Sequence, residues 1–216
     1  MAVPSAVEIG TRPKELFELR HLYAINERCL DLLVHAARAY RSDAFPLVND
    51  LGDLLRNMTP ETQARAAQRA LLLVDMHFTD GHWWQMAKDY PCRPVPLPAW
   101  RGTFARVGGV QLAYAALSLA WHAARSTPHH QVGLVGMTRE VSDIIAQLPI
   151  TELNSLAERR FKHLRPRWEE RPTVWRRLLV SSQSEDIRLA RDFSLYGIQL
   201  LTAELISPLG RSTSAS

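Results

Sequence analysis

One pattern occurs twice in this chain, in the same order both times, and any fold must accommodate that repeat. The tetrapeptide His35–Arg38 recurs as His122–Arg125, at an offset of 87 residues. The hydrophobic segment after Asp53 recurs after Asp143, at an offset of 90. Three additional residues between the two segments in the second copy reconcile these offsets. The shared order, spacing and hydrophobic pattern predict two diverged copies of one structural unit.

Hydrophobic periodicity predicts that each unit is α-helical. The first helix starts with Thr11 as N-cap and Pro13 in its first turn and extends to about Tyr40. Seven of its residues recur at alternating spacings of three and four and form a seam along one side of the helix, which favours packing against another helix. The residues of this seam are Leu16, Leu19, Tyr23, Asn26, Leu30, Leu33 and Ala37. Further helices are expected at about 45–55, 59–76, 107–125, 138–147, 149–164, 172–180 and 184–206, with a loop around His129 and His130 and a short amphipathic turn at 82–87.

A proline-rich segment separates the two units. Four prolines fall within the eight residues 91–98, which excludes a continuous helix and favours an extended connector. We therefore expect a first unit at 11–90, a connector at 91–106, a second unit at 107–206 and a flexible tail at 207–216. The predicted fold is all-α, with two tandem pseudo-symmetric units that form a pseudo-dimer within one chain.

The two copies differ at a polar position of the helical seam. Asn26 in the first seam corresponds to Ala113 in the second, and the same frame pairs Phe78 with Trp168. Two interpretations of Asn26 stay open: a polar residue that sets the register of the seam, or a residue that faces solvent.

Positive charge is concentrated in the second copy. The formal net charge is +4, but residues 159–177 contain eight Lys or Arg against two Glu. Guanidinium groups suit phosphate geometry, so this run predicts contact with DNA. The alternative is a solvated face neutralised by Glu158, Glu169 and Glu170. The candidate DNA-binding residues are Arg159, Arg160, Lys162, Arg165, Arg167, Arg171, Arg176 and Arg177.

Hydrophobic and aromatic residues at corresponding places in both copies predict interfaces. Each unit ends in a short Trp-bearing helix, and tryptophan commonly anchors cores and interfaces. The last helix carries a wide apolar face of Ile187, Ala190, Leu195, Ile198, Leu201, Leu205 and Ile206. The expected residues of the partner or internal dimer interface are Leu19, Tyr23, Asn26, Leu30, Leu33, Trp83, Trp84, Trp168 and Trp175.

The sequence carries no recognisable catalytic motif. It has no glycine-rich phosphate loop, nucleophile elbow or HExxH element, and His129 and His130 have no acidic residue beside them. The only cysteines, Cys29 and Cys92, are too few for a four-thiolate zinc site. We expect no enzymatic activity, cofactor or metal site. The absence of an export signal or a long apolar run predicts a cytoplasmic location away from the membrane.

The first unit resembles the FlhD family of flagellar transcriptional regulators. Segment 18–38 contains that family's His-x-Tyr-x-x-Asn element as His21, Tyr23 and Asn26, and the residues around Met58–Pro60 and His77–Asp80 are also similar. The resemblance covers about residues 15–85. The second unit lacks this element, and family members are normally half this length.

The resemblance implies a fused FlhD-type pseudo-dimer. FlhD forms an α-helical dimer that joins a zinc-binding FlhC subunit, and the complex binds promoter DNA and recruits RNA polymerase. The sequence therefore predicts a DNA-binding subunit of a transcriptional activator, with an FlhC-like partner, that serves flagellar genes or the transfer genes of a mobile element. The alternative is a helical adaptor that binds proteins and never contacts DNA.

Overall fold

The computed structural model describes residues 13–39, 46–89, 103–126 and 130–206. In the first half these residues form α1 (Pro13–Arg38), α2 (Pro46–Arg56), α3 (Pro60–Ala67), β1 (Val74–Asp75) and α4 (Gly81–Asp89). In the second half they form α5 (Arg106–Arg125), α6 (His130–Val135), α7 (Arg139–Ala146), η1 (Ile150–Glu152), α8 (Leu153–Arg160), η2 (Phe161–His163), β2 (Arg165–Pro166), α9 (Pro172–Gln183) and α10 (Ile187–Ile206). The predominance of helix confirms the expected all-α class.

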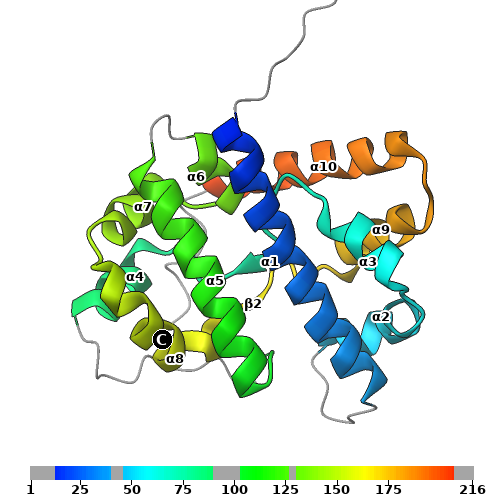
Figure 1. Cartoon of the computed structure of the whole chain (residues 1–216), viewed down its shortest axis with the longest axis horizontal. Coiled ribbons are helices and arrows are strands. Elements are labelled where there is room, and N and C mark those ends of the chain that lie inside the picture. Colours follow the sequence, from blue (N-terminus) through cyan, green and yellow to red (C-terminus); the bar gives the residue numbers. More distant parts are fainter. Residues whose placement is uncertain (1–12, 40–45, 90–102, 127–129, 207–216) are drawn as a thin grey trace, which may run out of the picture.

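Two long helices, α1 and α5, pack side by side in the middle of the molecule (Figure 1). Beyond α1 lie α2, α3, α9 and α10, and beyond α5 lie α4, α7 and α8. Each group mixes the two halves of the sequence, because α9 packs on α2 and α3 while α4 packs on α7. The buried hydrophobic residues form one cluster that both halves supply. None of the helices in the described segments is long and apolar enough to span a bilayer.

Helix starts follow the capping signals in the sequence. The Thr59 hydroxyl accepts the N–H of Thr62, and the Thr62 side chain accepts the N–H of Thr59, a reciprocal capping box that starts α3. Thr138 caps α7 by accepting the N–H of Val141. These caps confirm the predicted starts of both helices.

The prediction of a helix at 59–76 is wrong beyond Ala67, where α3 ends and the chain continues without helical structure. The buried side chain of Asn26 donates to the carbonyl oxygens of Ala67 at 3.1 Å and Leu71 at 2.9 Å, and its Oδ1 accepts the N–H of Leu73 at 2.8 Å. These bonds replace the hydrogen bonds that a helix would have supplied internally, so buried backbone without helical structure is stable here. The interpretation of Asn26 as a solvent-facing residue is also wrong.

This non-helical segment leads into a short antiparallel pair, β1 with β2, that joins the two halves. Val74 lies opposite Pro166, and Asp75 lies opposite Arg165. The sequence pattern predicted no strand, because two-residue strands are too short to show an alternating hydrophobic pattern.

The loop expected around His129 and His130 contains α6. Its last turn ends at Gly136, whose φ of 74° lies in the left-handed region that favours glycine. The Gly136 N–H donates to the carbonyl of Val132 at 3.0 Å. A Cβ at this position would lie 2.7 Å from the Arg167 guanidinium, so glycine also permits a close approach. His129 lies outside the described residues.

The expected connector at 91–106 falls largely outside the described residues. Its last residues are described, and Thr103 and Phe104 are buried against the core before α5 begins at Arg106. The second unit is therefore anchored just ahead of its first helix.

Gly108 permits the close contact between α5 and α1. A Cβ on Gly108 would lie 2.5 Å from Cδ2 of Leu32. We expect Gly108→Val to lower the free energy of unfolding by about 1–3 kcal/mol, because overpacking forces the helices apart. Urea denaturation measures this change. Gly133→Ala is the control, since a Cβ there meets no atom within 4 Å, and equal destabilisation by both variants would contradict the packing explanation.

Candidate nucleic-acid interface

The basic run predicted to bind DNA is divided by β2, which passes through the middle of the molecule. Before β2 the run follows α8 and η2, and after it the run follows a turn into α9. The extended backbone around Pro166 turns the side chains at 165 and 167 to one side, since alternate residues of a strand share a face. The eight residues therefore do not form one surface.

Arg167 is buried, only 2% exposed, and its guanidinium is engaged inside the protein. Its Nε donates to the carbonyl of Leu72 at 3.1 Å and its Nη2 to the carbonyl of Val135 at 2.7 Å. Its Nη1 donates to the Glu204 carboxylate at 3.3 Å. The prediction that Arg167 contacts DNA is corrected by this geometry, because no face of the guanidinium is left for phosphate.

Arg165 is also held by the protein. Its Nε and Nη2 donate to Oδ2 of Asp75 at 3.3 and 3.2 Å. Burial by itself raises the pKa of Asp75, but the Arg167 and Arg165 guanidinium groups lower it, and the net shift is downward. The Phe78 N–H donates to the other carboxylate oxygen of Asp75 at 3.1 Å. Arg165 thus serves as a structural counter-ion in this fold, not as a free cation.

Arg160 is also buried, 4% exposed, and lies near an aromatic cluster. In that cluster His77 stacks on Trp83 with ring centroids 4.7 Å apart, and His163 meets both rings edge-on. Burial lowers the pKa of His163 to about 4, with smaller contributions from His77 and Arg160. This cluster keeps His163 neutral near pH 7.

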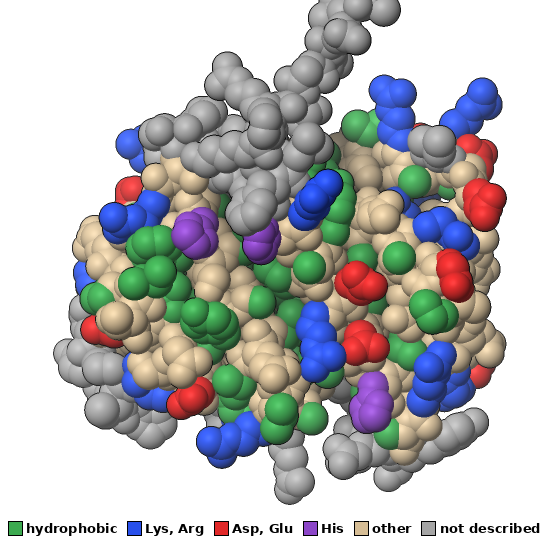
Figure 2. All heavy atoms as spheres, viewed as in Figure 1, with side chains coloured by type: hydrophobic (Ala, Val, Ile, Leu, Met, Phe, Trp, Pro, Cys, Tyr) green, Lys and Arg blue, Asp and Glu red, His purple; other side chains and the backbone are tan. Residues whose placement is uncertain are grey.

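The other five candidates are exposed and fall into two sets. The α8 group consists of Arg159 and Lys162, and the α9 group consists of Arg171, Arg176 and Arg177. Figure 1 places α8 and α9 in opposite halves of the molecule. On the face that carries α1 and α5, basic side chains are scattered among acidic ones (Figure 2).

The exposed arginines of the α9 group make only weak contacts. Arg171 lies 3.9 Å from the carboxylate of Glu170. Arg176 donates to the carbonyl of Asp50 at 3.5 Å, and Arg177 stacks over the ring of Tyr196 at 4.7 Å. Each guanidinium keeps donors for an external anion.

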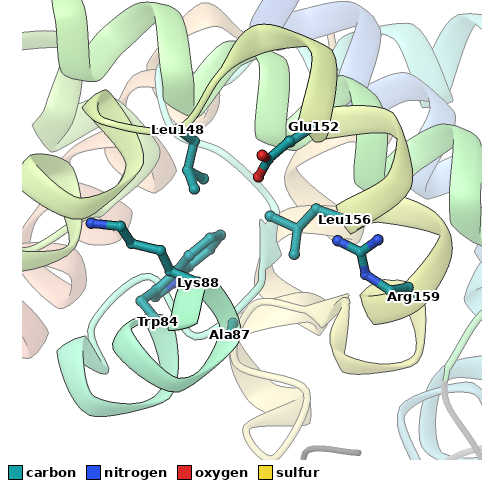
Figure 3. A pocket seen from close by; sticks show the side chains of 7 residues that line it. All are labelled: Trp84, Ala87, Lys88, Leu148, Glu152, Leu156 and Arg159. Atoms are coloured by element: carbon teal, nitrogen blue, oxygen red, sulfur yellow. The ribbon is translucent and has the colours of Figure 1, made fainter. Parts of the chain in front are cut away.

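A cation from the first half joins the α8 group, and sequence reasoning missed it. Lys88 of α4 and Arg159 of α8 line one small pocket with Glu152 (Figure 3). The other residues that line it are the apolar Trp84, Ala87, Leu148 and Leu156. No signal along the sequence connects Lys88 with Arg159, because only the packing between the halves brings them together. In contrast, Pro166 between two arginines is a sequence signal for extended chain with both arginines on one side.

Most of the residues expected at an interface lie inside this one chain. Leu19 and Tyr23 are half-buried. The remaining seven are buried: Asn26, Leu30, Leu33, Trp83, Trp84, Trp168 and Trp175. The seven buried residues form contacts within the chain.

Histidines and cysteines gather into no metal site in the described segments. There, no group of three or more His, Cys, Asp or Glu side chains is arranged to hold an ion. His35 and His122 are exposed at corresponding helix positions. Cys29 is a buried free thiol whose pKa is raised by burial, and Cys92 lies outside the described residues.

Comparison with known proteins identifies no relative of this chain. No protein-family model matches the chain, and neither a curated protein nor a solved structure is significantly similar to it. Its class is therefore defined by its own structure, as a predominantly helical protein with two exposed basic groups.

The engagement of Arg167 predicts a large stability effect. Arg167→Met leaves the Leu72 and Val135 carbonyls and one oxygen of the Glu204 carboxylate without this donor, so we expect a loss of about 3–5 kcal/mol in the free energy of unfolding. Chemical denaturation followed by circular dichroism measures it. Arg171→Met, at an exposed site, is the control and should change stability by less than about 0.5 kcal/mol. Similar losses in both variants would contradict the structural role of Arg167.

The lowered pKa of His163 predicts that the protein loses stability in acid. Its folded pKa of about 4 lies below the ordinary value of 6.5. Between about pH 6.5 and pH 4 the unfolded chain binds a proton at His163 that the folded chain does not bind. The free energy of unfolding therefore falls as the pH drops through that range. From pH 7 to pH 5 we expect this group to contribute a loss of about 2 kcal/mol.

The measurement is urea denaturation of the wild type and His163→Leu across that pH range. The variant should have a flatter stability profile, whereas His122→Leu, at an exposed position, should match the wild type. An unchanged profile in His163→Leu would contradict the assignment.

Proposed function

We propose that this chain is a non-enzymatic, DNA-binding subunit of a bacterial transcriptional activator. In this proposal it resembles FlhD, and two diverged helical units form a pseudo-dimer within one chain. Its exposed basic groups contact DNA phosphates, and an FlhC-like zinc-binding protein is its partner at the promoter.

Support for the duplication comes from the strand pair. The β1 residues Val74 and Asp75, moved forward by 91 positions, fall on the β2 residues Arg165 and Pro166. The register pairs Val74 with Pro166 and Asp75 with Arg165, so exchanging the two strands leaves the pairing unchanged. A pseudo-two-fold axis between β1 and β2 accounts for this symmetry.

Positions after the strands follow the same offset. His77 and Trp168, 91 residues apart, both have left-handed backbone, with φ of 54° and 56°. Helices α4 and α9 begin at Gly81 and Pro172, again 91 residues apart. This frame pairs Trp168 with His77 in place of Phe78, a shift of one residue from the pairing based on sequence.

The packing of the helices is reciprocal. Helix α4 of the first half packs on α7 of the second, and α9 of the second half packs on α2 of the first. Two chains that exchange corresponding elements across a two-fold axis have the same arrangement. The exchange supports a fused dimer better than two independent domains on a linker.

The observation that carries the DNA-binding proposal is the exposure of the two basic groups. Arg159, Lys162, Arg176 and Arg177 are exposed, and within the part of the chain that the structure describes none of them forms an ion pair. Because the groups lie in opposite halves, they suit phosphates at separate points along a duplex. Phosphate contacts position a protein without reading sequence, so base recognition falls to the partner.

DNA affinity across a salt series tests the proposal. We expect binding of the wild type to a mixed-sequence duplex to weaken steeply with salt, measured by fluorescence anisotropy. Arg176→Ala/Arg177→Ala should lower the affinity and reduce the slope of log K against log salt by about 2, and Arg159→Ala/Lys162→Ala should act similarly.

Arg20→Ala/Arg139→Ala removes the same charge from exposed positions outside both groups and is the matched control. Equal effects in all three double variants would indicate a net-charge effect only. Absence of binding by the wild type favours the adaptor, whose contacts are with proteins alone. Co-purification with a cysteine-rich, zinc-containing protein encoded by a neighbouring gene tests the partner.

A further inference from the structure

The last helix, α10, is fixed to the rest of the protein by one face. Phe193 and Leu201 on that face are buried. Gly197 lies between them, and a Cβ there would fall 2.3 Å from Cδ2 of Leu71. Trp168 Nε1 donates to the Glu204 carboxylate at the end of the helix. These contacts determine which side of α10 faces outward.

The outward side of α10 carries large exposed aliphatic side chains. Leu195 is 53% exposed, Ile198 is 42% exposed and Ile206 is 72% exposed. The wide apolar face expected from the sequence is thus divided between the core and solvent. The α10 seam consists of exposed positions that alternate spacings of three and four: Arg188, Arg191, Leu195, Ile198 and Thr202.

This spacing is that of helices that pack along each other. Residues at alternating three and four positions form the contact line between paired helices. Contiguous exposed apolar residues are uncommon on a surface without a partner. The two adjacent exposed aliphatic side chains of the seam, Leu195 and Ile198, therefore indicate a helical occupant.

We propose that the α10 seam docks on the same seam of a second copy of this chain, with the two helices antiparallel about a two-fold axis. The seam is self-complementary in this orientation. Leu195 and Ile198 of one copy pack on Leu195 and Ile198 of the other, so that one patch serves both partners, as a two-fold interface requires.

The distribution of charge selects the antiparallel arrangement. Arg188 and Arg191 occupy the amino-terminal part of the seam, and within the described residues neither side chain forms an ion pair. A parallel pair would place each arginine beside its own counterpart, which is repulsive. An antiparallel pair places them near the carboxyl end of the partner helix, where free carbonyls carry partial negative charge.

The size of the seam predicts weak association. One pair of 20-residue helices buries less than the roughly 1,200–2,000 Å² of a stable interface. We expect a dissociation constant on the order of 10 μM, with exchange between one and two copies. This proposal is independent of DNA binding and of the FlhC-like partner.

Sedimentation velocity of the full chain over a concentration series tests the proposal. The mass should rise from that of the 24.5 kDa chain towards that of a dimer as concentration increases. Leu195→Glu/Ile198→Glu should keep the chain monomeric at every concentration, because paired carboxylates would face each other across the seam. Circular dichroism and thermal melting check that this variant is folded.

The matched control is Val107→Glu/Val180→Glu, which adds the same charges at exposed apolar positions of α5 and α9. It should dimerise like the wild type. A wild type that stays monomeric at all concentrations would overturn the proposal and leave the seam to a helix of another protein. Dimerisation of the folded Leu195→Glu/Ile198→Glu variant would overturn it as well.

The antiparallel orientation of the two α10 helices is tested separately. Arg188→Glu/Arg191→Glu places acidic groups near the negative end of the partner helix and should weaken the antiparallel dimer on the order of five-fold. In a parallel dimer the same change replaces repulsion between arginines by repulsion between glutamates and leaves affinity unchanged. An unchanged dissociation constant would therefore contradict the antiparallel arrangement.

Discussion

Four separate segments of this protein meet at the guanidinium of Arg167. It donates to carbonyls before β1 and at the end of α6 and to a carboxylate on α10, and it lies 3.9 Å from Asp75. An arginine can do this because its five N–H donors are fixed in a plane and remain charged when buried. Such a residue is costly to bury unless its nitrogens are hydrogen-bonded, and all three nitrogens of Arg167 bond surrounding carbonyls or the Glu204 carboxylate.

Asn26 provides the neutral counterpart of this network. It satisfies both a donor and acceptors of the segment after α3, while Arg167 supplies donors to the same segment from the other half. Extended backbone in a core must find all its hydrogen bonds outside itself. Two side chains thus let the chain cross its own centre without a large sheet, and the helices pack around that crossing.

The sequence predicted those features that depend on local chemistry. The caps at Thr59 and Thr138 and the burial of Leu30 and Leu33 follow from residue type and periodicity, and the structure confirms them. The exit from the helix after Ala67 could not be predicted in this way, because an alanine-rich segment has high helical propensity. What overrides that propensity is a side chain 41 residues away.

The basic run shows the same limit for the candidate site. A count of arginines predicts how much positive charge a segment carries, but not which way each side chain points. Arg165 and Arg167 flank Pro166 in extended chain and turn inward to Asp75, while Arg176 and Arg177 lie on a helix and face outward. Charge that is contiguous in sequence is divided in space between structural and exposed roles.

The fusion of two units that we propose has a consequence for the ion pairs at the centre. In the frame of 91 residues, Arg165 and Arg167 of the second unit correspond to Val74 and Met76 of the first, and Asp75 corresponds to Pro166. Two identical chains would need the acid and both arginines in each copy, crowding two such sets around one axis. A fused pair needs only one set, so the second unit can supply the cations and the first the carboxylate. Under this proposal, covalent linkage permits a one-sided charged centre that a symmetric dimer could not build from these residues.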